Sequence, residues 1–508
     1  MTGSHEFVVV ANRLPVDVRI TDSGEVSWSR SPGGLVTALA PVMQSEDGAW
    51  VGWSGKADMD LEPFEADGLA LVPVRLSATE VERYYEGFAN ATLWPLYHDV
   101  IVDPTYHRMW WNAYLEVNRR FAEAAADAAA EHATVWVHDY QLQLVPQMLR
   151  RLRPDVRIGF FNHIPFPPVE LFGQLSWRQS VIQGLLGADL IGFQRTGDAA
   201  NFLRAVRRFT HYTPRGQSVT IGGHWTRPER RVRVGTFPIS IDSAQVDELA
   251  RSKKIEERAA QLRVELGDPD VLMLGVDRLD YTKGIRHRIK AYGELLEDRK
   301  ITVPTTTLVQ VASPSREQVL DYQNLRQEVE VMVGNINGEY SSWGHSAIYY
   351  MHHSYPHEEM IALYRAADVM LVTALRDGMN LVAKEYVAAR PDLGGALVLS
   401  EFAGAADELK QALIINPHDI EGLKAAMIQA ATMEPGERRR RMRTLRKRVL
   451  SGDVQTWARN FLAALHPEHH GHDHHGHEHN GHDRNGNEHE GSNRHGRGHH
   501  GHERSDDA

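Results

Sequence analysis

Short apolar runs alternate with longer stretches of helical periodicity along most of the chain. The runs are too short for buried helices and end in Gly, Pro or polar residues, so they predict strands. They are residues 7–11, 50–53, 134–137, 156–161, 190–193, 232–237, 271–276, 307–311, 347–351, 369–372 and 396–399. Helical spacing fills several of the gaps, as at 113–130, 243–266 and 317–332. This alternation predicts an α/β protein.

The pattern divides the chain into two alternating modules. The segment 238–242, Pro-Ile-Ser-Ile-Asp, has the character of a hinge between them, and an amphipathic helix over 454–465 follows the second module. A chain of 508 residues is also too long for one ordinary hydrophobic core. Two or three domains are therefore expected.

Polar residues follow two of the predicted strands in the first module. Asp139 comes just after the run 134–137, and His163 comes just after the run 156–161. Ligands of parallel α/β sheets bind outside the carboxyl ends of the strands, so both residues are candidates for chemistry. The alternative is that each polar residue only ends its strand.

The stretch 369–389 combines a strand, a turn and a helix start. The strand 369–372 is broken by Arg376-Asp377-Gly378, and helical spacing begins at Asn380, a predicted N-cap. A helix N-terminus after a Gly turn presents unpaired N–H groups to a phosphate. Glu385, more than one turn into this helix, is placed to accept hydrogen bonds from ribose hydroxyls. An ordinary strand-turn-helix unit with an exposed Glu is the alternative.

Two further segments have the composition of anion-binding loops. Arg278 and Lys283 lie five residues apart beside Gly284, and two such cations neutralise a diphosphate without a metal ion. Gly33 and Gly34 precede a helix-competent run over 36–43 and allow close approach of a ligand to the backbone. Exposed loop residues are the alternative in both cases.

Composition excludes several classes of function. The chain has no cysteine, which excludes disulfides, thiol catalysis and Cys-ligated metal sites. The absence of a long apolar run and of a signal-peptide pattern predicts a cytoplasmic protein that does not bind a membrane. The net charge of −11 argues against nucleic-acid binding, and the basic run over 438–447 is interpreted as a solvated helix face.

The chain changes character at His466. The segment 466–508 consists mainly of Gly, His, Asn, Asp, Glu and Arg, and holds 14 of the 28 histidines. A segment with almost no apolar residues is predicted to be disordered. Its imidazoles predict loose binding of divalent transition metals such as Ni²⁺, Zn²⁺ or Cu²⁺.

Eight motifs, in order, carry a family resemblance from about Phe7 to about Leu465. They are VVVANRLPV, SPGGL, WVGWSG, NATLWPLYHD, WVHDYQL, GFFNHIPFP, VDRLDYTKG and RDGMNLVAKEYVAA. In these motifs the chain resembles the bacterial-type trehalose-6-phosphate synthases, which are retaining nucleotide-sugar glycosyltransferases. The resemblance implies transfer of glucose from a nucleoside diphosphate glucose to glucose 6-phosphate.

The resemblance also implies a role for each motif residue. The acceptor glucose 6-phosphate would be bound by Arg13, Trp53, Tyr85, Trp94, Asp139 and Arg316. The donor nucleotide-glucose would be bound by Gly34, His163, Arg278, Lys283, Asp377, Gly378, Met379, Asn380, Leu381 and Glu385. Asp139, His163, Arg278 and Lys283 are the expected catalytic residues, and no metal or other cofactor is expected.

The fold implied by the resemblance is the glycosyltransferase B arrangement, in which two doubly wound Rossmann-like domains face each other across a cleft. The expected boundaries are 1–238 for the acceptor domain, completed by the terminal helix 452–465, and 239–451 for the donor domain. The tail 466–508 lies beyond them.

Several alternatives remain open on sequence alone. Front-face displacement, in which the departing phosphate takes the acceptor proton, is preferred over double displacement with Asp139 as nucleophile. UDP-glucose is the expected donor, with ADP- and GDP-glucose as alternatives, and a homodimer or homotetramer is expected. A catalytically silent sugar-phosphate sensor and a pseudo-glycosyltransferase that joins cyclitols are the competing functions.

Overall fold

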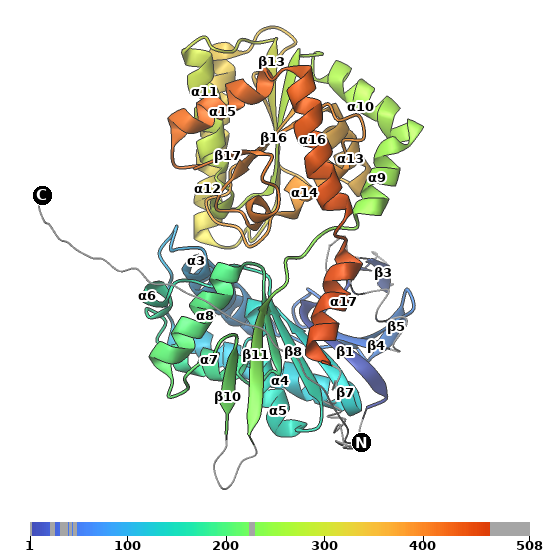
Figure 1. The fold of residues 1–508 in the computed structure, drawn as a ribbon, viewed down its shortest axis with the longest axis vertical. Coiled ribbons are helices and arrows are strands. Elements are labelled where there is room, and N and C mark those ends of the chain that lie inside the picture. Colours follow the sequence, from blue (N-terminus) through green and yellow to red (C-terminus); the bar gives the residue numbers. More distant parts are fainter. Residues whose placement is uncertain are drawn as a thin grey trace, which may run out of the picture. The chain divides into compact units, whose positions relative to one another are not determined.

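The first half of the chain forms a nine-stranded sheet in the computed structural model, which describes residues 3–20, 26–30, 39, 43, 48–222 and 229–467 (Figure 1). In spatial order the strands are β10 (Ser218–Ile221), β11 (Arg230–Thr236), β9 (Leu190–Phe193), β8 (Arg157–Asn162), β7 (Ala129–His138), β1 (His5–Arg13), β4 (Gly48–Trp53), β6 (Leu69–Pro73) and β5 (Phe64–Ala66). The pairs from β11 to β6 are parallel, and the edge strands β10 and β5 are antiparallel to their neighbours. Strands β2 (Val16–Ile20) and β3 (Val26–Arg30) form a separate antiparallel pair.

Both faces of this sheet are buried. Side chains of β1 alternate between two hydrophobic clusters, with Val8 and Val10 in one and Phe7 and Val9 in the other. The first cluster includes the apolar faces of α4 (Arg108–Ala128), α5 (Val145–Leu152), α7 (Arg178–Leu185) and α8 (Thr196–Phe209). Continuous apolar strands are the expected result, because a parallel sheet is covered on both sides.

The second half of the chain forms a six-stranded, wholly parallel sheet (Figure 1). Its order is β14 (Ile348–Met351), β13 (Thr306–Ser313), β12 (Val271–Arg278), β15 (Val369–Val372), β16 (Ala396–Ser400) and β17 (Leu413–Ile415). One face packs against α11 (Ile285–Glu297), α12 (Leu320–Tyr340) and α15 (Ile420–Ala431). The other packs against α9 (Ser243–Arg251), α10 (Lys253–Glu265), α13 (His357–Ala366), α14 (Leu381–Ala388) and α16 (Pro435–Leu450). The prediction of doubly wound α/β architecture in both halves is confirmed.

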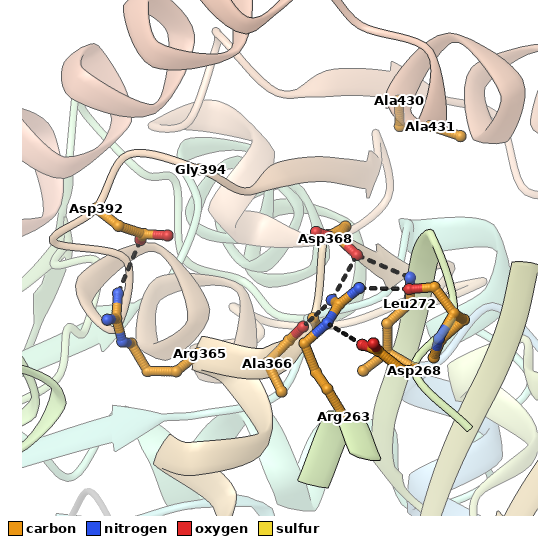
Figure 2. Close-up of polar contacts among 12 residues, drawn as sticks. Arg263, Asp268, Leu272, Arg365, Ala366, Asp368, Asp392, Gly394, Ala430 and Ala431 are labelled. Atoms are coloured by element: carbon orange, nitrogen blue, oxygen red, sulfur yellow. Dashed lines mark hydrogen bonds and ion pairs between the residues drawn. The ribbon is translucent and has the colours of Figure 1, made fainter. Parts of the chain in front are cut away.

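An arginine network fixes the amino-terminal ends of β12 and β15. Figure 2 shows Arg263 of α10 donating to the carbonyl of Ala366 and to Asp368 Oδ2, both at 2.8 Å. The same Asp368 oxygen accepts from the backbone N–H of Leu272 at 2.8 Å. One half-buried carboxylate therefore joins α10 to two neighbouring strands.

The terminal helix α17 (Val454–Leu465) packs on the first sheet, although α16 packs on the second. The Phe461 ring stacks on Trp136 of β7 at a centroid distance of 4.4 Å. A Cβ at Gly159 or Gly192 would lie 2.7 or 2.8 Å from the Phe461 ring, so these strand positions must be glycine for the helix to approach. The predicted bounds of this helix, 454–465, are confirmed.

Three predicted helices differ from those observed. The helix expected over 113–130 is α4, which runs from Arg108 to Ala128, and β7 begins at Ala129. The helix expected over 243–266 is two helices, α9 and α10, because Ser252 is extended and its hydroxyl caps α10 by accepting from Ile255 N. The helix expected over 317–332 begins at Leu320 and continues to Tyr340. Its last turns are held by Asn337, whose amide exchanges hydrogen bonds with the backbone of Ile348 at 2.8 and 2.9 Å. Periodicity alone does not contain that tertiary contact.

The helix expected over 36–43 lies almost wholly outside the described residues, as does the predicted tail from 468 onward. No helix in the described part of the chain is long and apolar enough to span a bilayer.

Candidate functional site

Asp139 and His163 lie at the carboxyl ends of β7 and β8, as the sequence predicted, and the neighbouring strands bring them together. Asp139 has a left-handed backbone (φ 73°), and its N–H donates to the Phe161 carbonyl at 2.8 Å. Its Oδ1 accepts from the backbone N–H of His163 at 3.0 Å. Burial raises the pKa of the Asp139 carboxyl to about 6, although three backbone N–H groups oppose the shift.

A second histidine, which the sequence analysis did not single out, contacts His163. Nδ1 of His138 lies 3.1 Å from Nε2 of His163. Burial lowers the pKa of His163 to about 3, and burial together with His163 lowers the pKa of His138 well below its ordinary value. Both rings are therefore neutral at pH 7, and one ring nitrogen donates to the other.

An aromatic wall lies at the ends of β1 and β4. The Trp53 ring, 4% exposed, contacts Tyr85 edge to face at a centroid distance of 5.7 Å. The guanidinium of Arg13 lies 5.3 Å from the Trp53 ring centroid. Gly55 has a left-handed backbone (φ 86°), and a Cβ there would lie 2.1 Å from the Arg13 guanidinium. Arg13 thus keeps its position over Trp53 only because residue 55 is glycine.

Tyr85 and Trp94 are presented by an unusual helix that the sequence pattern did not predict. The segment Val81–Leu93 (η1) is a π-helix and leads into α3 (Trp94–Tyr97). His98 caps this unit: its ring lies 4.2 Å from the Trp94 ring, and its Nδ1 lies 2.8 Å from the Trp94 carbonyl. Burial lowers the pKa of His98 to about 3, so it too is neutral. Wide π-type turns often mark functional sites.

Arg316 reaches from the second half of the chain to the aromatic wall of the first half. Its guanidinium carbon lies 3.7 Å from the Trp94 ring centroid, and Nη2 donates to the Tyr140 hydroxyl at 3.3 Å. Nη1 donates to Asp280 Oδ2 at 2.8 Å and also contacts the Tyr322 hydroxyl. Two buried donors here, Nε1 of Trp94 and Nε of Arg316, have no acceptor among the residues described.

Asp280 is fully buried beneath this arginine and is a site residue that the sequence analysis missed. Burial alone would raise its pKa, but the positive charges of Arg316, Arg278 and Lys283 hold the pKa well below the ordinary value. The carboxylate is therefore ionised, pairs directly with Arg316, and is stabilised by the nearby charges of Arg278 and Lys283.

In the sequence, the two predicted phosphate-binding cations, Arg278 and Lys283, lie on either side of Asp280. Arg278 ends β12, is exposed, and lies 5.6 Å from the Trp94 ring centroid. Lys283 Nζ donates to Asp377 Oδ2 at 2.5 Å. Burial opposes ionisation of Asp377, but the Lys283 charge and hydrogen bond lower its pKa overall. The loop of β12 and the turn after β15 therefore meet through one ion pair.

The predicted N-cap at Asn380 is confirmed. Asn380 Oδ1 accepts from Ala383 N at 3.0 Å, and its Nδ2 donates to Asp377 at 3.1 Å. Met379, with 4% exposure, precedes it, and Leu381 opens α14. A Cβ at Gly378 would lie 2.3 Å from the His163 carbonyl oxygen, so glycine permits this turn to contact the first half of the chain.

Glu385 lies on α14, where its Oε2 accepts from the Tyr364 hydroxyl at 3.0 Å. Burial raises the pKa of this carboxyl.

The last predicted site residue, Gly34, lies outside the described residues. In the described ranges no group of three His, Asp or Glu side chains has the arrangement of a metal site.

The arrangement joins directional hydrogen-bonding groups, a neutral imidazole and a carboxylate, to fixed positive charge. His163 and Asp139 provide directional hydrogen bonds on one side, and Arg278, Lys283 and the α14 N-terminus provide cations and N–H groups on the other. Such a set binds a neutral sugar next to a phosphate and stabilises negative charge that develops on a leaving phosphate.

Comparisons with known proteins give one consistent result. The sequence model of glycosyltransferase family 20 matches residues 5–467. A trehalose-6-phosphate synthase of Mycolicibacterium smegmatis is 59% identical over 468 residues, which cover 92% of this chain and 93% of the relative.

Two solved structures with bound ligands have a similar fold. An α,α-trehalose-phosphate synthase (UDP-forming) from Burkholderia xenovorans, in complex with glucose-6-phosphate, is 33% identical with a TM-score of 0.81, and the match covers 91% of this chain and 99% of that one. A structure from E. coli bound with UDP-2-fluoro glucose is 34% identical with a TM-score of 0.82, and the match covers 90% of this chain and 98% of that one.

Proposed function

The chain belongs to glycosyltransferase family 20, and from that premise we infer that it transfers glucose with retention from a nucleoside diphosphate glucose to glucose 6-phosphate. The product is α,α-trehalose 6-phosphate, and the fold is the glycosyltransferase B arrangement. The observation that carries the assignment of the site is the pair of buried donors on Trp94 and Arg316 that have no acceptor among the described residues. Buried donors of this kind require an acceptor, and the acceptor phosphate supplies the oxygens.

The acceptor is assigned to the aromatic wall. Arg316 and Arg13 neutralise the phosphate of glucose 6-phosphate, and Nε1 of Trp94 donates to it. The rings of Trp53 and Tyr85 pack against the acceptor. The Asp139 carboxylate accepts from an acceptor hydroxyl, which orients that hydroxyl toward the donor.

The donor is assigned to the second half of the chain. Arg278 and Lys283 hold the diphosphate. Asp377 accepts from glucose hydroxyls, and the backbone N–H groups of Met379, Asn380 and Leu381 donate to the donor, with Gly378 and Gly34 allowing close approach. Glu385 holds the ribose, and the neutral His163 contacts the transferred glucose.

The reaction follows from these charges. The bond between the anomeric carbon and the diphosphate oxygen breaks as negative charge grows on the phosphate, which Arg278, Lys283 and the α14 N-terminus stabilise. The acceptor hydroxyl oxygen bonds to the anomeric carbon on the same face, and its proton passes to the departing phosphate oxygen. These cations take the place of a divalent ion. Trapping of a covalent glucosyl adduct on Asp139 would instead establish double displacement.

The two substrates divide the chain into domains. Residues 1–238 with the terminal helix 452–465 form the acceptor domain, and 239–451 form the donor domain. Contacts between them support closure around the substrates: Arg195 pairs with Asp407 at 2.7 and 2.9 Å, and Arg376 lies 3.3 Å from Asp99. Scattering should show compaction with UDP plus glucose 6-phosphate, and an unchanged radius would contradict closure.

The remaining assignments concern partners. UDP-glucose is the proposed donor, ADP- and GDP-glucose being the alternatives, and the protein is proposed to be a cytoplasmic homo-oligomer, dimeric or tetrameric, that binds neither nucleic acid nor a membrane. The histidine-rich composition of 466–508 supports loose binding of divalent transition metals.

A turnover panel tests the proposed function. UDP-, ADP- and GDP-glucose are each offered with glucose 6-phosphate, and the product is identified by mass and anomeric configuration. Formation of the α,α-linked disaccharide phosphate without added metal is expected. Activity that disappears with EDTA and returns with Mg²⁺ would contradict the assigned role of the cations. Absence of any nucleotide release would favour the silent sensor.

A further inference from the structure

Arg288 of α11 is a fully buried arginine that lies outside the residues assigned to the substrates. Its Nη1 donates to Asp277 Oδ2 at 2.8 Å and to Gln310 Oε1 at 2.7 Å. Its Nε and Nη2 donate to the Thr373 hydroxyl at 3.2 and 3.0 Å. A Cβ at residue 275 would lie 1.9 Å from Nη1, so Gly275 leaves space in β12 for the guanidinium.

Two of the three partners of Arg288, Asp277 and Thr373, each adjoin one of the cations assigned to the diphosphate. Asp277 directly precedes Arg278 in β12. The Thr373 hydroxyl lies 3.2 Å from the Gly284 carbonyl and 3.4 Å from the Lys283 carbonyl. Because this oxygen accepts from Arg288, its single hydrogen is directed to the backbone that follows Lys283. One guanidinium is thus connected to the backbone of both phosphate-binding residues.

Stability alone is a weak explanation for this network. A buried ion pair pays a large desolvation penalty, and apolar side chains of similar volume often replace such pairs without loss of stability. A planar guanidinium with donors in fixed directions, however, holds two loops in one relative position.

We propose that Arg288 is a positioning residue that sets the spacing of Arg278 and Lys283 for the two phosphates of the donor. The inference rests on the proposed function, because those two cations are the ones assigned to the diphosphate. Arg288 itself touches no substrate. Its contribution is to preorganise the cations, so that binding energy is not used to order them.

Two substitutions test the positioning role, one at Arg288 and one at its partner Thr373. Arg288→Lys keeps the charge, but one ammonium group cannot satisfy both Asp277 and Thr373. Thr373→Val keeps the shape of the side chain and removes only the hydroxyl between Arg288 and Gly284. Thr373→Ser restores a hydroxyl and should recover most of the affinity that Thr373→Val loses.

Calorimetric titration with UDP is the direct readout, because it does not require turnover. We expect UDP affinity to fall roughly tenfold in Arg288→Lys and Thr373→Val, as is typical when a supporting hydrogen-bond partner is removed. Steady-state kinetics should show a higher KM for the donor and an unchanged KM for glucose 6-phosphate. If wild-type protein binds UDP but makes no disaccharide phosphate, the proposed function fails while the positioning test still applies.

Arg263→Lys is the matched control. Arg263 makes a similar network at the opposite, amino-terminal ends of β12 and β15 (Figure 2). This variant should lower the melting temperature without changing UDP affinity. The proposal is overturned if Arg288→Lys and Thr373→Val bind UDP as wild type does, or if Arg263→Lys weakens UDP binding equally. It is also overturned if donor and acceptor KM values rise together, because that result indicates general loosening.

Discussion

The two halves of the chain have the same architecture but different electrostatics at the carboxyl ends of their strands. In the first half, burial keeps His138 and His163 neutral and raises the pKa of Asp139 to about 6. In the second half, burial is offset by opposite charges in three pairs: Arg288–Asp277, Arg316–Asp280 and Lys283–Asp377, whose side chains are at most 14% exposed.

This difference matches the chemistry assigned to each half. Hydroxyl groups of a sugar require directional hydrogen-bond partners such as the neutral His163 and the Asp139 carboxylate, whereas a leaving diphosphate requires fixed positive charge. A parallel sheet supplies both because its strands converge at one edge and the chemistry depends only on the residues placed there. The rate of glucose transfer should therefore depend most on the charged residues at the carboxyl edge of the second sheet.

Removing that charge is expected to have the largest effect. Lys283→Met deletes the cation 2.5 Å from Asp377 and leaves the carboxylate buried without its partner. We expect kcat/KM for the donor to fall roughly 10²- to 10³-fold, because a preorganised group that stabilises developing charge is lost. Steady-state assays with UDP-glucose measure the change.

Lys424→Met controls for the loss of a buried lysine. Lys424 is 11% exposed at its side chain and pairs with Glu294 at 3.0 Å, between α15 and α11. It should lower stability and leave kcat/KM close to wild type. Equal rate losses in the two variants would mean that ion pairs of the second half act only through folding.

Arg316 is the second-half cation assigned to the acceptor phosphate, and its substitution tests that assignment. Arg316→Met removes the guanidinium 3.7 Å from the Trp94 ring and the partner of Asp280. The KM for glucose 6-phosphate should rise roughly a hundredfold, since truncating one member of a buried charge pair typically costs 2–5 kcal/mol. The preference for glucose 6-phosphate over glucose should fall with it.

A preference for the phosphorylated acceptor that persists in Arg316→Met would place phosphate recognition on Arg13 alone. Arg326→Met, at an exposed arginine of α12 paired with Glu330 at 2.8 Å, provides the control for a lost charge on the neighbouring helix.

The sequence predicted the strand ends well and the contacts between loops poorly. The N-cap at Asn380 and the places of Asp139 and His163 at strand ends follow from local patterns, because each depends on residues at the ends of regular elements. The left-handed backbone of both Asp139 and Asn380 does not follow, because Asp and Asn tolerate a positive φ without requiring it, so the residue type does not predict where it occurs.

Contacts between site residues that are far apart in the sequence could not be predicted from local patterns. Asp280 and Arg316 are 36 positions apart, and their pairing depends on how the loops after β12 and β13 pack. The π-helix at Val81–Leu93 likewise has an ordinary amphipathic sequence. His98 lies four positions after Trp94, so its stacking on that ring is a contact that local spacing indicates.

Asp198 allows the effects of burial and of a nearby positive charge to be compared at a contact between the two halves. This carboxyl of the first half is 1% exposed, and burial raises its pKa to about 6 although Arg376 of the second half lies 3.5 Å away. The folded state therefore binds an extra proton between about pH 4 and pH 6, and stability falls as pH rises through that window. Asp198→Asn should gain roughly 2 kcal/mol relative to wild type between pH 4.5 and pH 7.

Asp155→Asn should behave in the opposite way. Arg153 lowers the pKa of Asp155, which offsets the effect of burial, so the carboxylate stabilises the fold above its unfolded pKa and that stabilisation is lost as pH falls. Denaturant unfolding at several pH values compares the two variants with wild type. Parallel curves for Asp198→Asn and wild type would show that Arg376 neutralises the burial effect at this contact.

The smallest effect is expected from removing the tail. Every residue assigned to substrate binding or transfer precedes Leu465, and His466 makes the last described side-chain contact, in which its Nε2 lies 2.8 Å from the Thr134 hydroxyl. Deletion of 467–508 should leave kcat and both KM values within about twofold of wild type, a change below 0.5 kcal/mol. Binding of Ni²⁺ or Zn²⁺, measured by calorimetry, should be lost. A large change in kcat or KM on deletion would show that the tail contributes to the reaction in addition to the residues at the two sheet edges.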